Sequence, residues 1–176
     1  MRIRPEEPGD EDAIHELTLA AFAPMPFSDG SEAPIVRALR ASGDLTLSLV
    51  VVEDDAIIAH VAFSPVTIDG STDGWFGLGP VSVAPDRQRR GIGSDLIGIG
   101  LQRLRAAGAS GCALIGNPAV YRGMGFESDG RLTHHSLETA LVQRIVFRGP
   151  APRGELRFAP AFETVAQPGS QDDGSA

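Results

Sequence analysis

The chain has 176 residues, an apolar fraction of 42% and a formal net charge of −8, which suit one ordinary packed domain. The acidic charge argues against nucleic-acid binding, because affinity for a phosphate backbone comes from many cations spread over a surface. No stretch approaches the ~18 consecutive apolar residues that a membrane span needs, and no basic region followed by an apolar run marks the N-terminus. We therefore expect a cytoplasmic protein with one domain over residues 1–165, without nucleic-acid or membrane partners, and a disordered tail at 166–176.

The numbers of lysine, cysteine and histidine residues further restrict the reactions that the chain can catalyse. All fifteen basic residues are arginines, so the chain has neither a Schiff-base lysine nor the lysine of a Walker phosphate loop. The single cysteine, Cys112, lies beside apolar residues, and we expect its thiol to be buried and inert. His134 and His135 are neighbours whose side chains would point apart on a strand, so we expect no metal site.

The first half of the chain is predicted to fold into a strand, two helices and a hairpin. Apolar side chains recur at helical spacing between residues 10 and 22, and Pro24 and Pro26 end that helix. Gly43 ends the second helix, after which the pattern changes to β-rich runs. The predicted elements are a strand at Met1–Pro5, helices at Asp10–Phe22 and Glu32–Ala41, and antiparallel strands at Leu47–Glu53 and Ile57–Ile68.

The second half is predicted to add a parallel crossover and two closing strands. A strand-like run that contains Gly77, Gly79 and Pro80 predicts a bulge or local opening. The strand, helix, strand order after it implies a right-handed parallel connection, and a turn at 148–154 is expected to join the closing strands. The elements are strands at Trp75–Val83, Cys112–Ile115, Leu141–Phe147 and Glu155–Phe158, and helices at Gly93–Ala107 and Asn117–Met124. Together they predict an α/β fold with a mixed sheet.

The segment from Val83 to Gly93 joins the bulged strand to a helix and has the features of an anion site. Two glycines let the backbone approach a ligand closely, and the first N–H groups of a helix lack partners within it. The helix dipole adds ~0.3–1 kcal/mol for a phosphate group. A pyrophosphate is the expected guest, and a solvated arginine loop is the alternative. The positive charge comes from Arg87, Arg89 and Arg90.

Two other phosphate-binding motifs do not fit the same residues. A Walker loop needs a lysine followed by serine or threonine, and the chain has no lysine. A dinucleotide-binding fingerprint needs a third glycine three residues after the second, where Leu96 stands. Neither motif explains the segment.

The turn reads Gln88-x-x-Gly91-x-Gly93. This pattern resembles the coenzyme A motif of the GNAT acetyltransferase superfamily, whose form is Gln/Arg-x-x-Gly-x-Gly/Ala. The resemblance includes the preceding Val81–Pro85 and the later Asn117–Phe126, which contains Tyr-x-x-x-Gly-Phe. The order of the predicted elements agrees with it, and the chain is similar to the compact bacterial subgroup of predicted N-acetyltransferases.

The resemblance implies a mostly antiparallel central sheet flanked by helices, with a parallel pair of strands that splay apart for acetyl-CoA. It implies that the strand pairs through its backbone with the pantetheine arm, and that an N–H near Val81 or Ser82 holds the oxyanion of the thioester. Amides from Arg89 to Ser94 would hold the pyrophosphate. The implied cofactor-binding residues are Val81, Ser82, Val83, Gln88, Arg89, Arg90, Gly91, Ile92, Gly93, Ser94, Asn117 and Tyr121.

Tyr121 and Asn117 each have two interpretations. Tyr121, the only tyrosine in the chain, stands where the family often has a general acid that protonates the departing thiolate. A phenol of pKa ~10 is a reasonable donor to a thiolate whose thiol has a pKa of ~8.5, but the ring also suits packing against the cofactor or the core. Asn117 either bonds the pantetheine arm or caps its own helix.

The sequence does not identify the general base for the amine. Many relatives carry a glutamate in the strand at Trp75–Val83, and this chain has none there. Glu53, His60 and Asp73 remain open as bases that act through water. Each of them has an alternative role in a turn or on the sheet surface.

The sequence favours direct acetyl transfer from acetyl-CoA to a primary amine of a small molecule, in a ternary complex and without a covalent enzyme intermediate. A non-catalytic acyl-CoA-binding regulatory domain is an alternative that the missing glutamate supports, and protein N-acetylation is another. In this family the loop that corresponds to Ala23–Asp29 usually covers the acceptor. The identity of the amine and the formation of a homodimer stay open.

Overall fold

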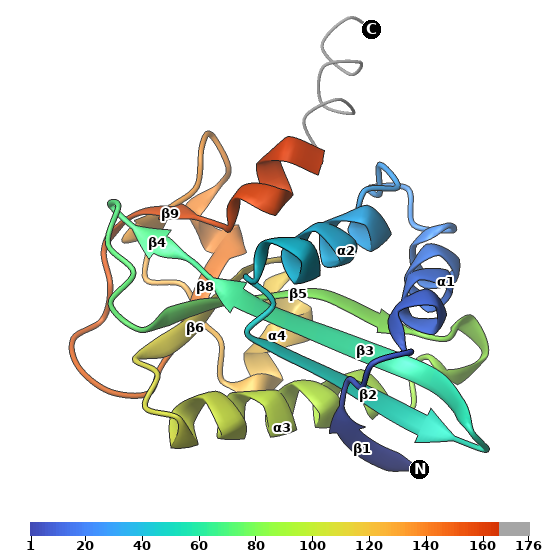
Figure 1. Ribbon diagram of the computed structural model, residues 1–176. Coiled ribbons are helices and arrows are strands. Elements are labelled where there is room, and N and C mark those ends of the chain that lie inside the picture. Colours follow the sequence, from blue (N-terminus) through green and yellow to red (C-terminus); the bar gives the residue numbers. More distant parts are fainter. Residues whose placement is uncertain (166–176) are drawn as a thin grey trace, which may run out of the picture.

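The computed structural model describes residues 1–165, and the tail predicted at 166–176 lies outside the described residues. The predicted strands and helices follow one another in the expected order, with short additions (Figure 1). The strands are β1 (Arg2–Pro5), β2 (Leu47–Glu53), β3 (Ala56–Pro65), β4 (Thr67–Ile68), β5 (Trp75–Val83), β6 (Gly111–Ile115), β7 (Leu132–Thr133), β8 (Val142–Val146) and β9 (Gly154–Arg157). The α-helices are α1 (Glu11–Phe22), α2 (Glu32–Ser42), α3 (Ile92–Ala106) and α4 (Pro118–Tyr121), the 3-10 helices are η1 (Pro85–Arg87), η2 (Arg122–Met124) and η3 (Thr139–Leu141), and residues 160–165 are helical.

Six strands form the main sheet in the order β1-β2-β3-β5-β6-β8. Neighbouring strands are antiparallel except β5 and β6, which run parallel and are connected through α3. The expected α/β fold, with a mixed and mostly antiparallel sheet and one parallel pair flanked by helices, is confirmed.

The helices cover opposite faces of this sheet, with α3 on one side and α1 and α2 on the other (Figure 1). The alternation of side chains along β2 explains the arrangement, because successive residues of a strand point to opposite faces. Val50 packs against Ile14 of α1 and Val36 of α2, whereas Leu49 and Val51 belong to the core beneath α3. A strand with apolar residues on both faces therefore lies between two helical layers.

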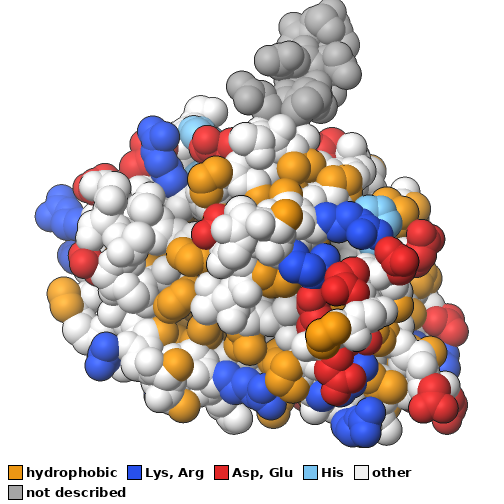
Figure 2. Space-filling view, in the orientation of Figure 1, with side chains coloured by type: hydrophobic (Ala, Val, Ile, Leu, Met, Phe, Trp, Pro, Cys, Tyr) orange, Lys and Arg blue, Asp and Glu red, His pale blue; other side chains and the backbone are white. Residues whose placement is uncertain are grey.

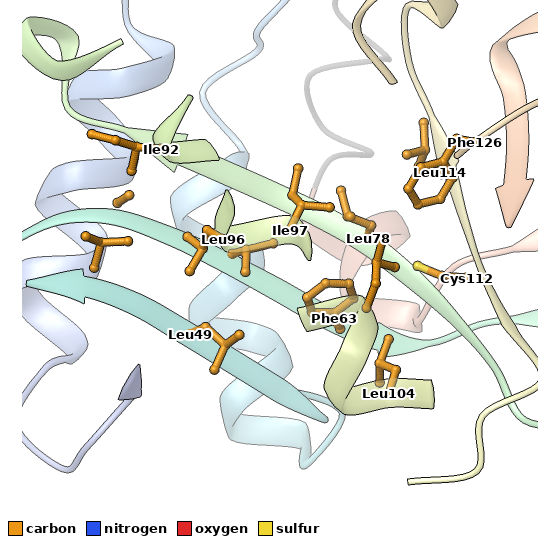
Figure 3. Close-up of a cluster of buried hydrophobic side chains, with 14 of the residues drawn as sticks. Leu49, Phe63, Leu78, Ile92, Leu96, Ile97, Leu104, Cys112, Leu114 and Phe126 are labelled. Carbon is orange, nitrogen blue, oxygen red and sulfur yellow. The ribbon is translucent and has the colours of Figure 1, made fainter. Parts of the chain in front are cut away.

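The larger core fills the space between α3 and the sheet (Figure 3). Leu96 and its apolar neighbours on α3 lie against Phe63 of β3, as the helical spacing predicts. Gly100 lies so close to the ring of Phe63 that no Cβ fits between them, so a glycine is required there. Cys112 is 0% exposed in this core, and burial raises the pKa of its thiol, which confirms the expected buried cysteine.

A second sheet, of three strands in the order β4-β9-β7, is not predicted by the sequence. The predicted strand Ile57–Ile68 divides after Pro65, and its last two residues join this second sheet as β4. The two closing strands do not form one hairpin, because β9 pairs with β4 and β7. The carboxylate of Asp69 accepts the Glu155 N–H at 2.7 Å, which fixes β9 beside β4.

Residues 1–165 contain no helix with both the length and the apolarity needed to cross a bilayer. On the face shown in Figure 2, the arginines of the described chain are mixed with acidic side chains and form no continuous basic patch.

Candidate active site

The parallel strands β5 and β6 separate partway along their length. Their register runs from Trp75 opposite Gly111 to Gly77 opposite Ala113 and then stops. Strand β6 continues beside β8, and the remainder of β5, Leu78–Val83, has only β3 as a neighbouring strand in the described chain. We call this segment the free edge of β5. Its outer backbone donors and acceptors are available to an extended ligand.

The predicted bulge lies at the start of the free edge. Where the register with β3 shifts, between Leu78 and Val81, β5 has one more residue than β3. Gly79 has φ = 132°, which favours glycine, and the Gly79–Pro80 peptide is cis. Because proline has no N–H, the ladder lacks a donor at Pro80. The expectation of a local irregularity at these residues is confirmed.

The three residues after the bulge divide between the two faces of the sheet. Val81 and Val83 pack against the core beneath α3. Ser82 is buried on the opposite face, where its Oγ lies 3.3 Å from Thr18 Oγ1 of α1. A ligand along the free edge therefore meets the backbone of these residues.

The turn between β5 and α3 contains two residues with a left-handed backbone. Arg89 has φ = 64°, and Gly91, the N-cap of α3, has φ = 81°. The first helical hydrogen bond runs from the Asp95 N–H to the Gly91 carbonyl, so the N–H groups of residues 92–94 have no helical partner. Several free amides therefore lie at the positive end of a 15-residue helix.

The three arginines of the turn differ in their partners. Arg87 donates to Glu53 at 2.9 Å and to Asp86 at 2.8 Å, and the bond to Glu53 raises the pKa of its guanidinium. Arg89 and Arg90 are exposed and make no ion pair within residues 1–165. The charge available to an anion therefore comes from Arg89 and Arg90, while Arg87 fastens the turn to the β2–β3 hairpin.

Two of the predicted cofactor contacts also serve the fold. Gln88 Nε2 donates to the Val83 carbonyl at 3.1 Å and so closes the turn. Asn117 Oδ1 accepts the Ala119 N–H at 2.9 Å as the N-cap of α4. The structure therefore confirms that Asn117 caps its own helix. Its amide nitrogen forms no hydrogen bond in the described part of the chain, and its contact with a pantetheine arm stays a prediction.

Tyr121 lies on α4, just after the end of β6, and its ring rests on the backbone of Gly116. A Cβ on Gly116 would lie 2.7 Å from a ring carbon, so the position requires glycine. The ring also meets Phe126 edge-on, with centroids 6.2 Å apart. Burial raises the pKa of the phenol above its ordinary value of 10, so the hydroxyl is protonated at neutral pH. A ring with a fixed position and a retained proton meets two requirements of a general acid.

The three bases that the sequence leaves open lie in different places. Glu53 is bound to Arg87. Asp73 lies two residues before β5, at the opposite end of the strand from the α3 turn. His60 lies on β3 as the cross-strand partner of Ser82 and is 0% exposed. Of the three, only His60 pairs with a residue of the free edge.

His134 and His135 do not point apart, contrary to the expectation. Strand β7 ends at Thr133 and His135 has φ = 51°, so the alternation of a strand does not apply to them. Their ring centroids are 4.2 Å apart, and His134 Nδ1 donates to the Leu156 carbonyl at 2.8 Å. Within residues 1–165, no group of three or more His, Cys, Asp or Glu side chains is arranged to hold a metal ion.

One polar cluster around His60 is missed by sequence reasoning. It contains Glu6, Arg40 and Ser48, which come from three separate parts of the chain. The only sign of it in the sequence is a histidine within a mostly apolar strand. That sign gives no indication of the partners.

Comparison with known proteins identifies the family. The chain matches the family model of an acetyltransferase (GNAT) domain over residues 2–128. It is 36% identical over 138 residues to the uncharacterized N-acetyltransferase YhbS of Escherichia coli (strain K12), and the match covers 78% of each chain.

Two solved structures have the same fold. A GNAT family acetyltransferase from Brucella melitensis in complex with acetyl-CoA is 46% identical, with a TM-score of 0.83 over 92% of this chain and 97% of that one. The GNAT family N-acetyltransferase YhbS from Escherichia coli in complex with CoA is 29% identical, with a TM-score of 0.84 over 92% of this chain and 91% of that one.

The family model covers the whole site from β5 to Phe126. The chain belongs to the GNAT family of acetyltransferases, which confirms the resemblance seen in the sequence. It is accordingly an acyltransferase.

Proposed function

We propose that this chain binds acetyl-CoA and transfers the acetyl group to a primary amine of a small molecule, by direct attack in a ternary complex. The observation that carries the proposal is the free edge of β5 beside the unbonded amides at the start of α3. The free edge suits an extended arm with amide groups, and the helix start suits a pyrophosphate. The relatives solved with acetyl-CoA and with CoA support this choice of cofactor.

In the proposed complex, the pyrophosphate lies on the amides of residues 89–94. Arg89 and Arg90 supply positive charge, and the backbone of the free edge pairs with the pantetheine arm. An N–H near Val81 or Ser82 polarises the thioester carbonyl. The proposed contacts are Val81, Ser82, Val83, Gln88, Arg89, Arg90, Gly91, Ile92, Gly93, Ser94, Asn117 and Tyr121.

Direct attack is favoured because the chain has no suitable thiol to carry the acetyl group. Its single cysteine, Cys112, is 0% exposed, and burial raises the pKa of the thiol. The amine nitrogen therefore attacks the thioester carbon itself. As the C–S bond breaks, Tyr121 donates its proton to the sulfur of coenzyme A.

We place the acceptor beside the loop between α1 and α2, within Ala23–Asp29. Phe27 in this loop is 76% exposed and offers an aromatic surface to a small molecule. The loop belongs to the helical layer that covers Ser82 of the free edge. Because acetyl-CoA is used in the cytoplasm, we also place the reaction there.

Release of free thiol from acetyl-CoA, measured across a panel of small primary amines, tests the proposal. We expect saturable turnover with at least one amine and no acetylated enzyme by mass spectrometry after mixing with acetyl-CoA alone. Binding of CoA without turnover of any amine would favour a regulatory acyl-CoA-binding domain. Acetylation confined to proteins in a cell extract would favour a protein substrate, and failure to bind CoA would refute the cofactor.

A further inference from the structure

A chain of hydrogen bonds runs inward from the surface to His60, beside the free edge. His60 Nε2 lies 2.8 Å from Ser48 Oγ, and Ser48 Oγ donates to Glu6 Oε1 at 2.5 Å. Glu6 also accepts two hydrogen bonds from Arg40, one from Nε at 2.6 Å and one from Nη2 at 3.1 Å. The four side chains come from β3, β2, the segment after β1, and α2. The chain of bonds therefore exists only in the folded protein.

These bonds determine which ring nitrogen of His60 carries the proton. The Glu6 carboxyl is partly buried, which alone raises its pKa, but the hydrogen bonds from Arg40 and Ser48 outweigh burial and lower it. Ionised Glu6 takes the single hydroxyl hydrogen of Ser48. Ser48 Oγ must then accept the Nε2–H of His60. Nδ1 consequently carries a lone pair, and it is buried without a hydrogen-bond partner in the described chain.

The two ends of the chain of bonds reach different surroundings. At the outer end, Glu6 and Ser48 line an open cavity of about 300 Å³. At the inner end, His60 is the cross-strand partner of Ser82, and the Cβ atoms of such partners lie ~4.5–5.5 Å apart. Ser82 Oγ makes only a long contact of 3.3 Å with Thr18, compared with the usual ~2.7–2.8 Å between hydroxyls. The Ser82 hydroxyl is therefore weakly held, on the residue that pairs with His60 across the two strands.

Stability does not explain a polar chain in this position. Ile14, Val36 and Val50 form an apolar cluster on the same face of the sheet, and an apolar residue in place of His60 would leave no nitrogen buried without a partner. A buried acceptor without a partner is destabilising, and buried ion pairs are often no better than apolar packing. Polar groups that lower the stability of the fold and lie beside the free edge of β5 indicate a role in the reaction.

We propose that Glu6, Ser48 and His60 form a proton relay, which carries the proton of the attacking amine from Ser82 to the cavity at Glu6. The proposal rests on the acetyl transfer proposed above, and it gives a path to a proton for which the sequence shows no glutamate on β5. His60 acts through Ser82 and does not touch the amine. It is a positioning residue in this reaction.

The relay conserves protons and electrons at each step. The C–N bond forms as the amine nitrogen attacks, and the nitrogen loses a proton to the Ser82 hydroxyl, whose own proton passes to His60 Nδ1. This step requires that the Ser82 hydroxyl, which is 1% exposed and donates to Thr18 in the structure, turn away from Thr18 toward the amine and His60 Nδ1. Nε2 then gives its proton to Ser48, and the Ser48 proton passes to Glu6 and on to water. When the C–S bond breaks, its electron pair stays on sulfur and is protonated by Tyr121.

The relay never needs a charged imidazole. Burial lowers the pKa of His60 to about 4, and of the two charged groups that act on it, Glu6 opposes the decrease while Arg40 adds to it. The flanking strands and α1 contribute hydroxyl groups, from Ser48, Ser82 and Thr18, that do not titrate in this range. His60 is neutral at physiological pH because its pKa is about 4. It also stays neutral during the proton transfer, because one ring nitrogen gains a proton as the other loses one.

The test interrupts the relay at its middle member. Ser48→Ala leaves His60 and Glu6 in place, and we expect kcat to fall about 100-fold with an unchanged KM for acetyl-CoA. The rate of this variant should rise with pH, because solvent must then remove the proton, whereas the wild type has a flat profile over the same range. Ser48→Thr restores the hydroxyl and should restore both readouts.

The matched control is Ser64→Ala, which removes a buried hydroxyl that lies on β3, the strand of His60, and has no partner in the described chain. This variant should leave kcat and the profile unchanged. Wild-type kinetics in Ser48→Ala, or an equal loss in Ser64→Ala, would overturn the relay. If the wild type acetylates no amine, the proposed function fails by itself. The relay is then judged on the hydrolysis of acetyl-CoA, where water replaces the amine: slower hydrolysis in Ser48→Ala supports it and unchanged hydrolysis overturns it.

Discussion

The two sides of the proposed active site are built in different ways. On the cofactor side, the groups that face a ligand are backbone amides, in the turn before α3 and along the free edge of β5. On the acceptor side, the polar groups are side chains brought together from four elements around His60. A backbone site depends on glycines and on the order of strands. A network of side chains depends on tertiary packing, so the two sides should respond differently to substitution.

The largest effect is expected from Tyr121, the one side chain with a proposed chemical role on the cofactor side. Tyr121→Phe keeps the ring that packs on Gly116 and removes the proton donor. We expect kcat to fall by ~10²–10⁴, with the dissociation constant of CoA unchanged. Thiol-release kinetics and calorimetric titration with CoA measure the two quantities. Weaker CoA binding with an unchanged kcat would show that the residue only packs against the cofactor.

The next effect concerns stability on the acceptor side as the pH falls. Burial lowers the pKa of His60 from 6.5 to about 4, so between these values the unfolded chain binds a proton that the folded protein does not. The contribution of His60 to the free energy of unfolding is therefore fully present above about pH 6.5. It is lost as the pH falls toward 4, by about 3 kcal/mol in all. Chemical denaturation at a series of pH values measures this loss.

Two substitutions separate His60 from the other histidines. His60→Gln should remove most of the pH dependence between 6.5 and 4, while His135→Asn, at an exposed position, should retain it. An equal slope in wild type and His60→Gln would contradict the assignment of the acid sensitivity to His60. The Glu6 carboxylate, whose pKa is lowered, adds a further loss of stability below its ordinary value of 4.5 in both proteins.

The contrast between the two sides also explains how far the sequence predicts the molecule. The α3 turn is predicted because Gly91 and Gly93 are local signals for a backbone conformation, and the parallel pair follows from the order of elements. Ser48 and Glu6 carry no such signal, since their contact joins residues far apart in the chain. The second sheet is not predicted from the sequence, because β4 and β7 have only two residues each. Such short strands have no pattern of their own and are formed only by pairing with β9.

A smaller effect is expected from the backbone of the turn. Gly91 has φ = 81° and open space around its Cα, so Gly91→Ala introduces conformational strain and no clash. We expect the free energy of unfolding to fall by ~1–2 kcal/mol and CoA to bind more weakly. Gly98→Ala is the control, because Gly98 lies within α3, also in open space and without a positive φ. There alanine should stabilise the helix by up to ~1 kcal/mol, and a destabilisation equal to that of Gly91→Ala would contradict the argument from φ.

The smallest effect is expected from the exposed arginines of the turn, and it separates backbone from charge on the cofactor side. If the amides hold the pyrophosphate and the side chains add only screened attraction, Arg89→Ala and Arg90→Ala should each weaken CoA binding by about 0.3–1 kcal/mol. The loss should disappear at high salt, because the Debye length is only ~3 Å at 1 M. Arg103→Ala, at the opposite end of α3, should not change CoA affinity. A loss that persists in high salt would mean that an arginine binds the phosphate directly, and that the cofactor side depends on side chains as the acceptor side does.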